Sequence, residues 1–185
     1  LALAQGDGRL ASFHRAAAAT LRAKYTGHEA EVALRLAGHL EGSGQLAEAA
    51  RFLLLAAQRS RRNGNWTDAK EQLESAEHAL QADGSSGHDR ARAEIWLELA
   101  SVEIRDSNLE RAQSLAARVY RWADEHDKTL SGRAMMVLGD SLRRLKRLSD
   151  AARAYEKAVE IFEDVRDEHA IARGTLGQVL VAKEL

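Results

Sequence analysis

The chain contains no cysteine, no proline and no run of about 18 consecutive apolar residues. Without cysteine it has neither a disulfide framework nor a cysteine-based zinc site. Without a long apolar run no membrane span is predicted, and the opening LALAQGDGRL does not read as a signal peptide. The abrupt start and end lead us to expect a piece of a longer protein.

Aromatic residues are scarce, and neither sign of charge dominates. Phe, Trp and Tyr make up 5% of the 185 residues, so we expect a core of Leu and Ala filled by the close approach of helices. The 27 basic and 28 acidic residues give a net charge of −1. The chain therefore lacks the excess of basic residues that is typical of a nucleic-acid-binding protein. A charged fraction of 30%, with many Ala, Leu, Glu and Arg, is typical of long amphipathic helices.

Helical spacing of apolar residues predicts an all-α chain of about nine helices in one domain. Gly42-Ser43-Gly44 and Asn63-Gly64-Asn65 are the strongest stop signals. We expect a linker or frayed end at residues 1–8 and a flexible seam at 83–87 between sub-blocks 9–82 and 88–185. The expected helices cover 9–24, 28–41, 46–62, 65–81, 88–105 and 109–125, a hairpin over 129–163, and 169–185.

Three positions are expected to cap helices. Thr26 with Glu29 and Ser107 with Glu110 have the spacing of capping boxes, and Asn65 precedes the fourth helix. We also expect Trp66 and Trp96 to lie in the core, because large aromatic side chains bury the most area; the position of Trp122 is left open.

A repeated pattern runs through the chain. In LGDSLRRLKRLSDAARAYEKAV, residues 138–159, a Leu-Gly pair and a leucine precede a turn at Lys146-Arg147, and Ala151, Tyr155 and Ala158 follow it. Equivalent pairs begin at residues 99, 138 and 176, so the spacings are 39 and 38 residues.

This pattern resembles the tetratricopeptide repeat, in a variant with units of about 40 residues instead of about 34. The resemblance covers nearly all of residues 28–185. It implies a right-handed superhelical solenoid of antiparallel helix hairpins whose first helices line a concave face. The chain departs from the pattern in lacking the closing proline, in having Glu103 where an aromatic or Leu is usual, and in having Ser107 and Lys146 where the turn glycine is usual.

Residues 9–80 also resemble the helical segment that follows the nucleotide-binding module in large bacterial signalling ATPases and some multidomain kinases. The resemblance is carried by RLASFHR at 9–15, ALRLAGH at 33–39, and GQLAEAA at 44–50 with LAA at 55–57. It implies a sensor or scaffold arm of a cytoplasmic signalling protein. The chain has no phosphate-binding loop or kinase signature, so ATP chemistry would lie outside it.

No catalytic, metal or cofactor site is recognisable in the sequence. The seven histidines, at positions 14, 28, 39, 78, 88, 126 and 169, show no pairing at metal-ligand spacing. The chain has no nucleophile elbow, and its carboxylates are expected on solvated helix faces. We therefore expect a protein that is not an enzyme, with no cofactor and no metal.

In the tetratricopeptide-repeat family, residues around the Leu-Gly pair form the inner surface of the superhelix. The resemblance therefore implies that the matching residues of this chain form a concave partner-binding face. Its residues are Glu94, Leu97, Ser101, Arg105, Arg133, Met136, Asp140, Arg143, Arg144, Ile171 and Gln178. The Lys and Asn residues with which some family members clamp a C-terminal carboxylate are absent from these positions. An interaction scaffold or regulatory module is therefore the first hypothesis; a peptide or small-ligand sensor that changes superhelical shape is the alternative.

The run Arg143-Arg144-Leu145-Lys146-Arg147 has two interpretations. It is either a solvated helix end, where cations favour the helix dipole, or a patch for an acidic protein or peptide. Arg105 and Arg144 are one repeat apart and are expected to stack, with Glu94 and Asp140 as internal partners. If these two carboxylates satisfy the arginines, the patch is structural; if they do not, the patch awaits an acidic partner. We expect no nucleic acid and no membrane as partner.

The last helix is expected to expose an apolar face or to pair with a second copy. Its apolar residues are Ile171, Leu176, Val179, Leu180 and Val181. A repeat array ends in a capping helix with a polar outer face, and no such helix follows here. An exposed apolar face and self-association through this helix are therefore the two alternatives.

Overall fold

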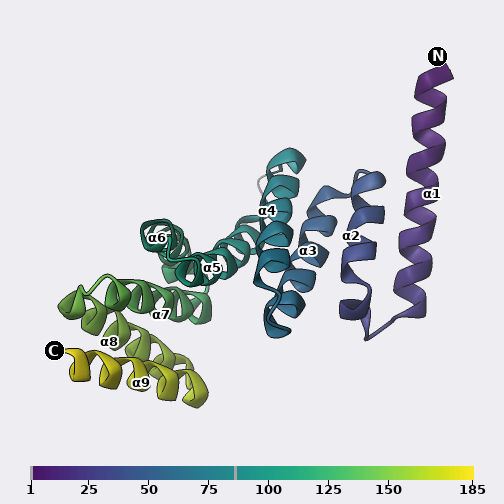
Figure 1. Cartoon of the computed structure of the whole chain (residues 1–185). Coiled ribbons are helices and arrows are strands. Elements are labelled where there is room, and N and C mark those ends of the chain that lie inside the picture. The colour runs from purple at the N-terminus through teal and green to yellow at the C-terminus, as the bar shows by residue number, and fades with distance from the viewer. Residues whose placement is uncertain (1, 86) are drawn as a thin grey trace. The chain divides into compact units, whose positions relative to one another are not determined.

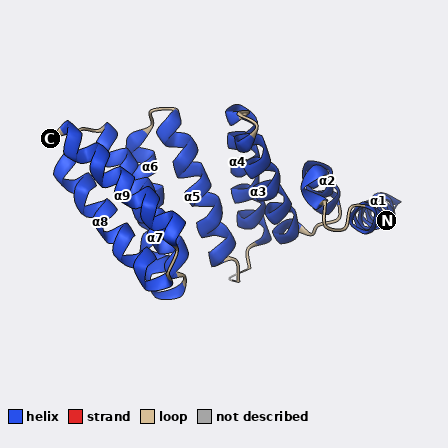
Figure 2. Cartoon of the chain, turned by 90° about the horizontal axis from the view of Figure 1, so that it is seen from below, coloured by secondary structure: helices blue, strands red, loops and turns tan. Residues whose placement is uncertain are grey.

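The computed structural model describes residues 2–85 and 87–185, except for the side chains of residues 2–7. Throughout this part of the chain the regular structure is helical (Figures 1 and 2). The elements are α1 (Ala2–Lys24), a short 3₁₀ helix η1 (Glu29–Glu31), α2 (Ala33–Gly42), α3 (Leu46–Arg62), α4 (Trp66–Asp83), α5 (Asp89–Arg105), α6 (Leu109–His126), α7 (Lys128–Arg144), α8 (Leu148–Val165) and α9 (Glu168–Glu184). The prediction of an all-α fold with about nine helices is confirmed.

The chain divides into two compact units, Leu1–Ile95 and Trp96–Leu185. In the first unit α1 packs on α2, α2 on α3, and α3 on α4. In the second unit α6, α7, α8 and α9 pack in sequence, and α7 also touches α9. This is the stacking of neighbours that a solenoid requires. The division falls inside α5, whereas we placed the seam at residues 83–87, of which residue 86 lies outside the described residues.

Helix α1 begins earlier than expected. It starts at Ala2 and includes Gly6-Asp7-Gly8, so the described residues 2–8 are helical and not a linker; the alternative of a frayed end stays a prediction. Glycine disfavours a helix without forbidding it, and no proline removes a backbone donor here.

Five tight turns share one backbone geometry. In each, a backbone N–H donates to the carbonyl five residues earlier, at 2.8 to 3.0 Å; the donors are Gln45, Asn65, Asn108, Arg147 and Asp167. In each turn the preceding residue has a positive φ: Gly44 at 79°, Gly64 at 81°, Ser107 at 64°, Lys146 at 60° and Arg166 at 58°. This is the bond pattern of the Schellman motif, which satisfies the last carbonyls of a helix. The stops predicted at Gly44 and Gly64 are confirmed, and three turns use residues other than glycine.

The predicted side-chain caps do not form. Thr26 donates to the carbonyls of Arg22 and Ala23, so it closes α1 instead of opening α2. Ser107 occupies the left-handed turn position, and the residue before α6 is Asn108, which makes no side-chain cap. Asn65 does precede α4, but it also makes no side-chain cap hydrogen bond. Side-chain caps occur instead at α7 and α9, where Asp127 and Asp167 accept from Leu130 N and Ala170 N at 3.0 Å.

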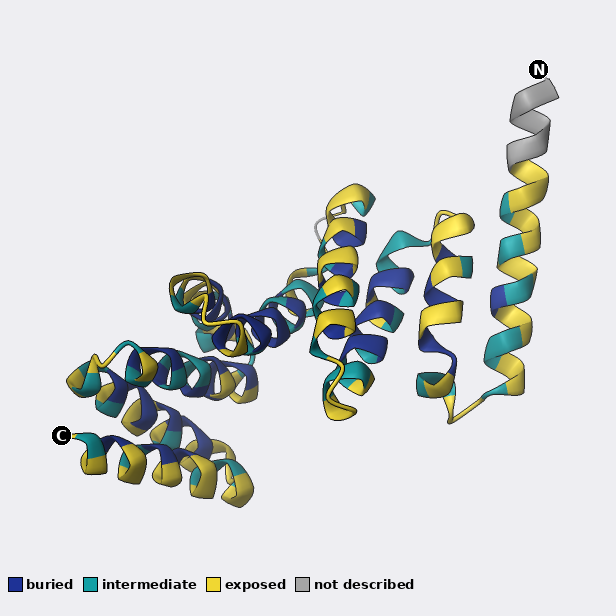
Figure 3. Cartoon of the chain, viewed as in Figure 1, coloured by how far each residue is buried: buried dark blue, intermediate teal, exposed yellow. Residues whose placement is uncertain are grey.

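Glycines allow the helices of the second unit to approach closely. A Cβ built on Gly139 of α7 would lie 2.8 Å from Tyr155 Cε1, and one built on Gly177 of α9 would lie 2.5 Å from the same atom. The Tyr155 ring of α8 therefore lies against the backbone of two helices and is 1% exposed. Gly132 makes the same kind of contact with the ring of Phe162. Figure 3 shows the buried faces that result.

The first unit is packed mainly through alanine and leucine. Val32, Leu36 and Leu40 of the α2 region form a cluster with Ala18 of α1 and Ala49 of α3. On α3 the residues Ala49, Ala50, Leu53, Ala56 and Ala57 are buried, which is one face of a helix. The charged side chains of Glu48 and Arg51 lie on the other face of α3.

The tryptophans are less buried than expected. Trp66, Trp96 and Trp122 are all half-buried. The Arg118 guanidinium lies 3.7 Å from the ring centroid of Trp96, and Trp122 stacks on His126 at 5.1 Å. Trp66 and Trp96 thus lie at the edge of the core instead of within it.

Glu103 is fully buried at a position where the repeat pattern usually has an aromatic residue or Leu. Its Oε2 accepts from Asn108 Nδ2 at 2.6 Å, and its Oε1 lies 2.8 Å from Arg111 Nη1. The carboxylate ties the end of α5 to the turn and to α6. A buried charge that is paired and hydrogen-bonded in this way replaces the usual apolar residue.

Helix α9 exposes part of its apolar face. Leu176 is 59% exposed, and Val179 and Leu180 are also exposed, as predicted. Val181 is buried, and Ile171 packs against the core of the second unit, so these two residues do not belong to the exposed face. Among the described residues, no helix has both the length and the apolar composition of a membrane span.

The contact of Gly177 with Tyr155 predicts the effect of adding a methyl group. In a helix alanine is favoured over glycine by about 1 kcal/mol, but overpacking costs about 1–3 kcal/mol. We expect Gly177→Ala to lower the free energy of unfolding by about 1–2 kcal/mol in urea denaturation. Gly38→Ala on α2 is the control, because its Cβ would meet no atom within 4 Å; it should stabilise the protein. Equal stabilisation by both variants would contradict the packing described.

The positive φ of Ser107 predicts a stabilising substitution. A non-glycine residue in the left-handed region costs about 1–2 kcal/mol, part of which is offset by the extra freedom of glycine in the unfolded chain. We expect Ser107→Gly to raise the melting temperature by roughly 1–3 °C in calorimetry. Ser114→Gly, at an exposed position inside α6, should lower it. A lower melting temperature for Ser107→Gly would refute this account of the turn.

Candidate functional site

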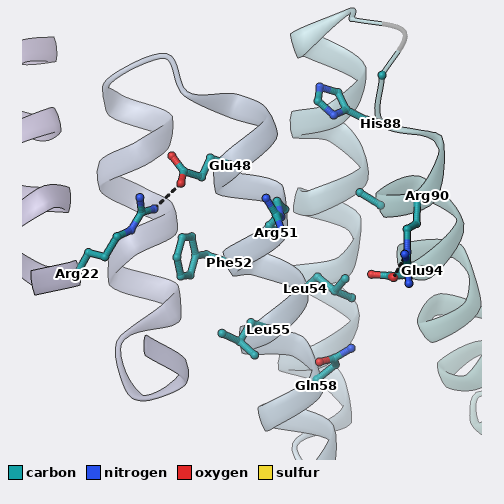
Figure 4. A pocket seen from close by; sticks show the side chains of 12 residues that line it. Arg22, Glu48, Arg51, Phe52, Leu54, Leu55, Gln58, His88, Arg90 and Glu94 are labelled. Carbon is teal, nitrogen blue, oxygen red and sulfur yellow. Dashed lines mark hydrogen bonds and ion pairs between the residues drawn. The ribbon is translucent and has the colours of Figure 1, made fainter. Parts of the chain in front are cut away.

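An open hollow of about 810 Å³ lies within the first unit (Figure 4). Its walls come from α1, α3, the first turns of α5 and the segment before α5. The lining residues are Arg22, Glu48, Arg51, Phe52, Leu54, Leu55, Gln58, Gly87, His88, Arg90, Ala91 and Glu94. Arg51, Gly87 and Arg90 are exposed, so the hollow is open to solvent.

The sequence of α3 accounts for one wall of the hollow. Glu48, Arg51, Leu55 and Gln58 follow one another at spacings of three or four residues and therefore share a helical face. The opposite face is the alanine-rich one that packs in the core. In Figure 4, Leu54, Leu55 and Gln58 follow α3, and Arg90 and Glu94 project from α5 across the hollow.

Arg22 of α1 closes one end of the hollow. Its Nη2 donates to Glu48 Oε1 at 2.5 Å, and its guanidinium lies 5.3 Å from the ring centroid of Phe52. Gln45 Nε2 donates to the other Glu48 oxygen at 3.2 Å. The ion pair and the cation–π contact together hold Arg22 against α3.

The cations of the hollow differ in their partners. Arg22 is paired with Glu48, and Arg90 Nε donates to Glu94 Oε1 at 3.2 Å. Arg51 makes no hydrogen bond or ion pair with any residue that the structure describes. An exposed guanidinium beside the apolar side chains of Phe52 and Leu55 offers a bidentate donor for a carboxylate.

A Ser–His–Asp cluster lies at the rim, in the segment between α4 and α5. Ser85 Oγ lies 2.7 Å from His88 Nε2, and His88 Nε2 lies 3.0 Å from Asp83 Oδ2. Hydrogen bonds from Ser85 and from His88 lower the pKa of Asp83. Serine and aspartate share one ring nitrogen, whereas a catalytic relay needs them on opposite nitrogens. The cluster therefore orders the connection and is not a nucleophilic triad.

Few of the residues predicted from the repeat pattern lie at this hollow. Glu94 lines it. Leu97 and Met136 are 1% and 9% exposed and belong to the core, so they offer no surface to a partner. Ile171 and Gln178 are half-buried, Arg105 is exposed, and Ser101 is half-buried and donates to the carbonyl of Leu97.

The arginines of the predicted patch have internal partners, but not the expected ones. Arg133 Nη2 lies 3.1 Å from the buried Glu98, Arg143 Nη1 lies 2.6 Å from Glu184, and Arg144 Nη1 donates to the carbonyl of Ile104 at 3.0 Å. Asp140 instead accepts from the Tyr155 hydroxyl at 2.6 Å, and Glu94 pairs with Arg90.

The rest of the basic run is paired as well. Lys146 Nζ lies 2.8 Å from Glu184, and Arg147 Nη2 lies 2.6 Å from Asp150. Lys146 and Arg143 lower the pKa of Glu184, and the hydrogen bond to Glu184 raises the pKa of Arg143. The run is therefore paired through Glu184 and Asp150, and not through the Glu94 and Asp140 expected from the sequence. Within the second unit it joins α7 to α9.

The sequence reasoning missed Arg22, Arg51 and the other α1 and α3 residues of the hollow. From the sequence, the apolar residues of 46–62 were expected in the core, and the structure places them there. The opposite face of this helix was not considered. The charges at positions 48, 51 and 59 share that other face and were the available signal.

Comparison with known families supports the resemblance inferred from the repeats. Residues 91–164, which comprise most of α5, all of α6 and α7 and nearly all of α8, match the family model of the tetratricopeptide repeat. This match supports a tetratricopeptide-repeat protein, a class that generally mediates protein–protein interaction. The all-helical repeat is typically not an enzyme. A comparison with curated proteins finds no significant match. The described residues contain no group of three or more His, Cys, Asp or Glu that could hold a metal ion.

The ion pairs of Glu184 predict a pH-dependent contribution to stability. Its pKa is lowered in the folded chain, so the contribution is present above the ordinary value of 4.5 and is lost as the pH falls through the folded value. We expect Glu184→Gln to lower the melting temperature at pH 7, and we expect its difference from the parent chain to shrink as the pH falls below 4.5, by circular dichroism. Glu156→Gln, at an exposed position on α8, is the control and should change little over the same pH range. A pH-independent difference for Glu184→Gln would contradict the structural role of these pairs.

Proposed function

We propose that the protein is an interaction module of a cytoplasmic signalling protein and that it binds an acidic segment of a partner protein in the hollow of its first unit. The observation that carries this proposal is Arg51, an exposed cation that has no partner among the described residues and lies beside the apolar side chains of the hollow. The signalling context rests on the resemblance of residues 9–80 to helical arms of signalling ATPases and kinases.

The composition of the hollow favours a short acidic and apolar segment. A ligand carboxylate can take two parallel hydrogen bonds from Arg51. A neighbouring aliphatic side chain can pack on Phe52 and Leu55, which are half-buried and retain accessible apolar surface. Glu48 and Glu94 already pair with the other two arginines and would repel carboxylates placed over them, which restricts where the acidic residue lies.

The open form of the hollow favours a protein partner over the small-ligand alternative. A small-molecule pocket buries most of its ligand among apolar side chains. Here three arginines and two glutamates line a space that is open to solvent. The basic run at residues 143–147, by contrast, is paired internally and is not part of the proposed site.

A peptide-display selection tests the proposal. Peptides selected on the whole chain should be enriched in Asp and Glu next to Leu, Ile or Val. In calorimetric titrations of a selected peptide, Arg51→Glu should weaken binding at least about tenfold, because it removes a bidentate donor and adds a like charge. Affinity for the parent chain should also fall as salt rises.

The matched control is Arg62→Glu, which makes the same charge change at an exposed position near the end of α3, outside the hollow lining. It should leave the affinity within about twofold, equivalent to less than 0.5 kcal/mol. Basic or purely apolar selected peptides, or equal losses in the two variants, would refute the proposed site.

A further inference from the structure

Two histidines from different helices meet in the first unit. His14 of α1 and His39 of α2 bring their Nδ1 atoms to 3.0 Å, with ring centroids 5.2 Å apart and ring planes at 49°. Both side chains are half-buried. The two positions are 25 residues apart in sequence, so no short metal-binding motif marks them.

The packing of α1 on α2 holds this pair in place. A Cβ on Gly42 would lie 2.8 Å from the His14 ring, so the ring rests directly on the α2 backbone. Ala18 of α1 is buried in a cluster with Val32, Leu36 and Leu40, and Leu21 packs against it. The backbone positions of both histidines are therefore fixed by apolar contacts that do not involve the imidazoles.

Apart from their contact with each other, the two imidazoles make no hydrogen bond or ion pair with any residue that the structure describes. In the described part of the chain, the hydrogen bond between the two Nδ1 atoms is the one polar contact that either ring makes, and no carboxylate pairs with either. In that contact one Nδ1–H donates and the other Nδ1 accepts. If the donor ring moves its proton to Nε2, both Nδ1 lone pairs become available without a net change of protonation.

The two nitrogens lie at a hydrogen-bonding distance that is closer to one coordination geometry than to another. With metal–nitrogen bonds of about 2.0–2.1 Å, adjacent ligands lie about 2.9 Å apart in a square-planar or tetragonal site and about 3.4 Å apart in a tetrahedral one. The distance of 3.0 Å is close to the first value. Tetragonal coordination by nitrogen and oxygen is characteristic of Cu²⁺ and Ni²⁺.

We propose that His14 and His39 form a binding site for a tetragonal divalent cation, Cu²⁺ or Ni²⁺, with water in the remaining positions. Both ligands are neutral imidazole nitrogens, which suit these ions, and Cu²⁺ stands highest in the affinity order. The bound ion would link α1 to α2. This site is separate from the hollow and does not depend on the proposed function.

Titration of the whole chain with NiCl₂ and, separately, with CuCl₂ tests the site. We expect one ion per chain by isothermal titration calorimetry at pH 7.5, with at least about tenfold weaker binding in His14→Ala and in His39→Ala. The electron paramagnetic resonance spectrum of the Cu²⁺ complex should show coupling to two imidazole nitrogens. Cu²⁺ should raise the melting temperature of the parent chain and leave that of the double variant unchanged.

His78→Ala is the control, because it removes an exposed histidine from α4 and leaves the pair intact; its affinity should equal that of the parent. His14→Gln and His39→Gln provide polar replacements, and circular dichroism confirms that each variant keeps its helix content. The proposal is overturned if the parent chain binds neither ion, if binding survives in the folded double variant, or if tetrahedral Zn²⁺ binds more tightly than Cu²⁺.

Discussion

The packing of Tyr155 against two glycines is the contact on which the second unit depends. Its ring lies against the backbone of α7 at Gly139 and of α9 at Gly177, and a methyl group at either position would overlap it. Close helix approach of this kind lets a chain with few aromatic residues build a dense core, since alanine and glycine fill the facing positions. The Tyr155 hydroxyl remains satisfied because Asp140 accepts its hydrogen bond, and burial with this bond raises the pKa of the phenol.

The packing of small residues against neighbouring helices also determines which side chains line the candidate site in the first unit. Helix α3 buries its small residues and leaves Glu48, Arg51, Phe52 and Leu55 on the opposite face. These side chains therefore line a hollow, and Phe52 also packs against the core of the first unit. Internal carboxylates neutralise Arg22 and Arg90, whereas Arg51 makes no hydrogen bond or ion pair with any residue that the structure describes. The proposed recognition of an acidic segment rests on this difference between the three arginines, not on the number of charges.

The helices were largely predictable, because Gly44 and Gly64 stop them and small apolar residues recur at helical spacing. The turns were harder: Ser107 looks like a cap in sequence, yet the Schellman bond from Asn108 to Glu103 places it in the left-handed region. Local spacing cannot show that a carboxylate such as Glu103 is buried and paired across helices. Of the predicted site residues only Glu94 lies at the hollow, because the hollow joins α1, α3 and α5 across about 70 residues of sequence. The contact between His14 and His39 depends on tertiary packing in the same way.

The central claim is that the exposed face of α3 and the start of α5 form the partner-binding surface. Chemical-shift mapping with an isotope-labelled chain and a selected acidic peptide tests it most directly. The largest amide shifts are predicted at residues 48–58 and 87–94, and residues 133–147 should change little. Shifts concentrated on α7 and α9, with residues 48–58 unaffected, would contradict the account.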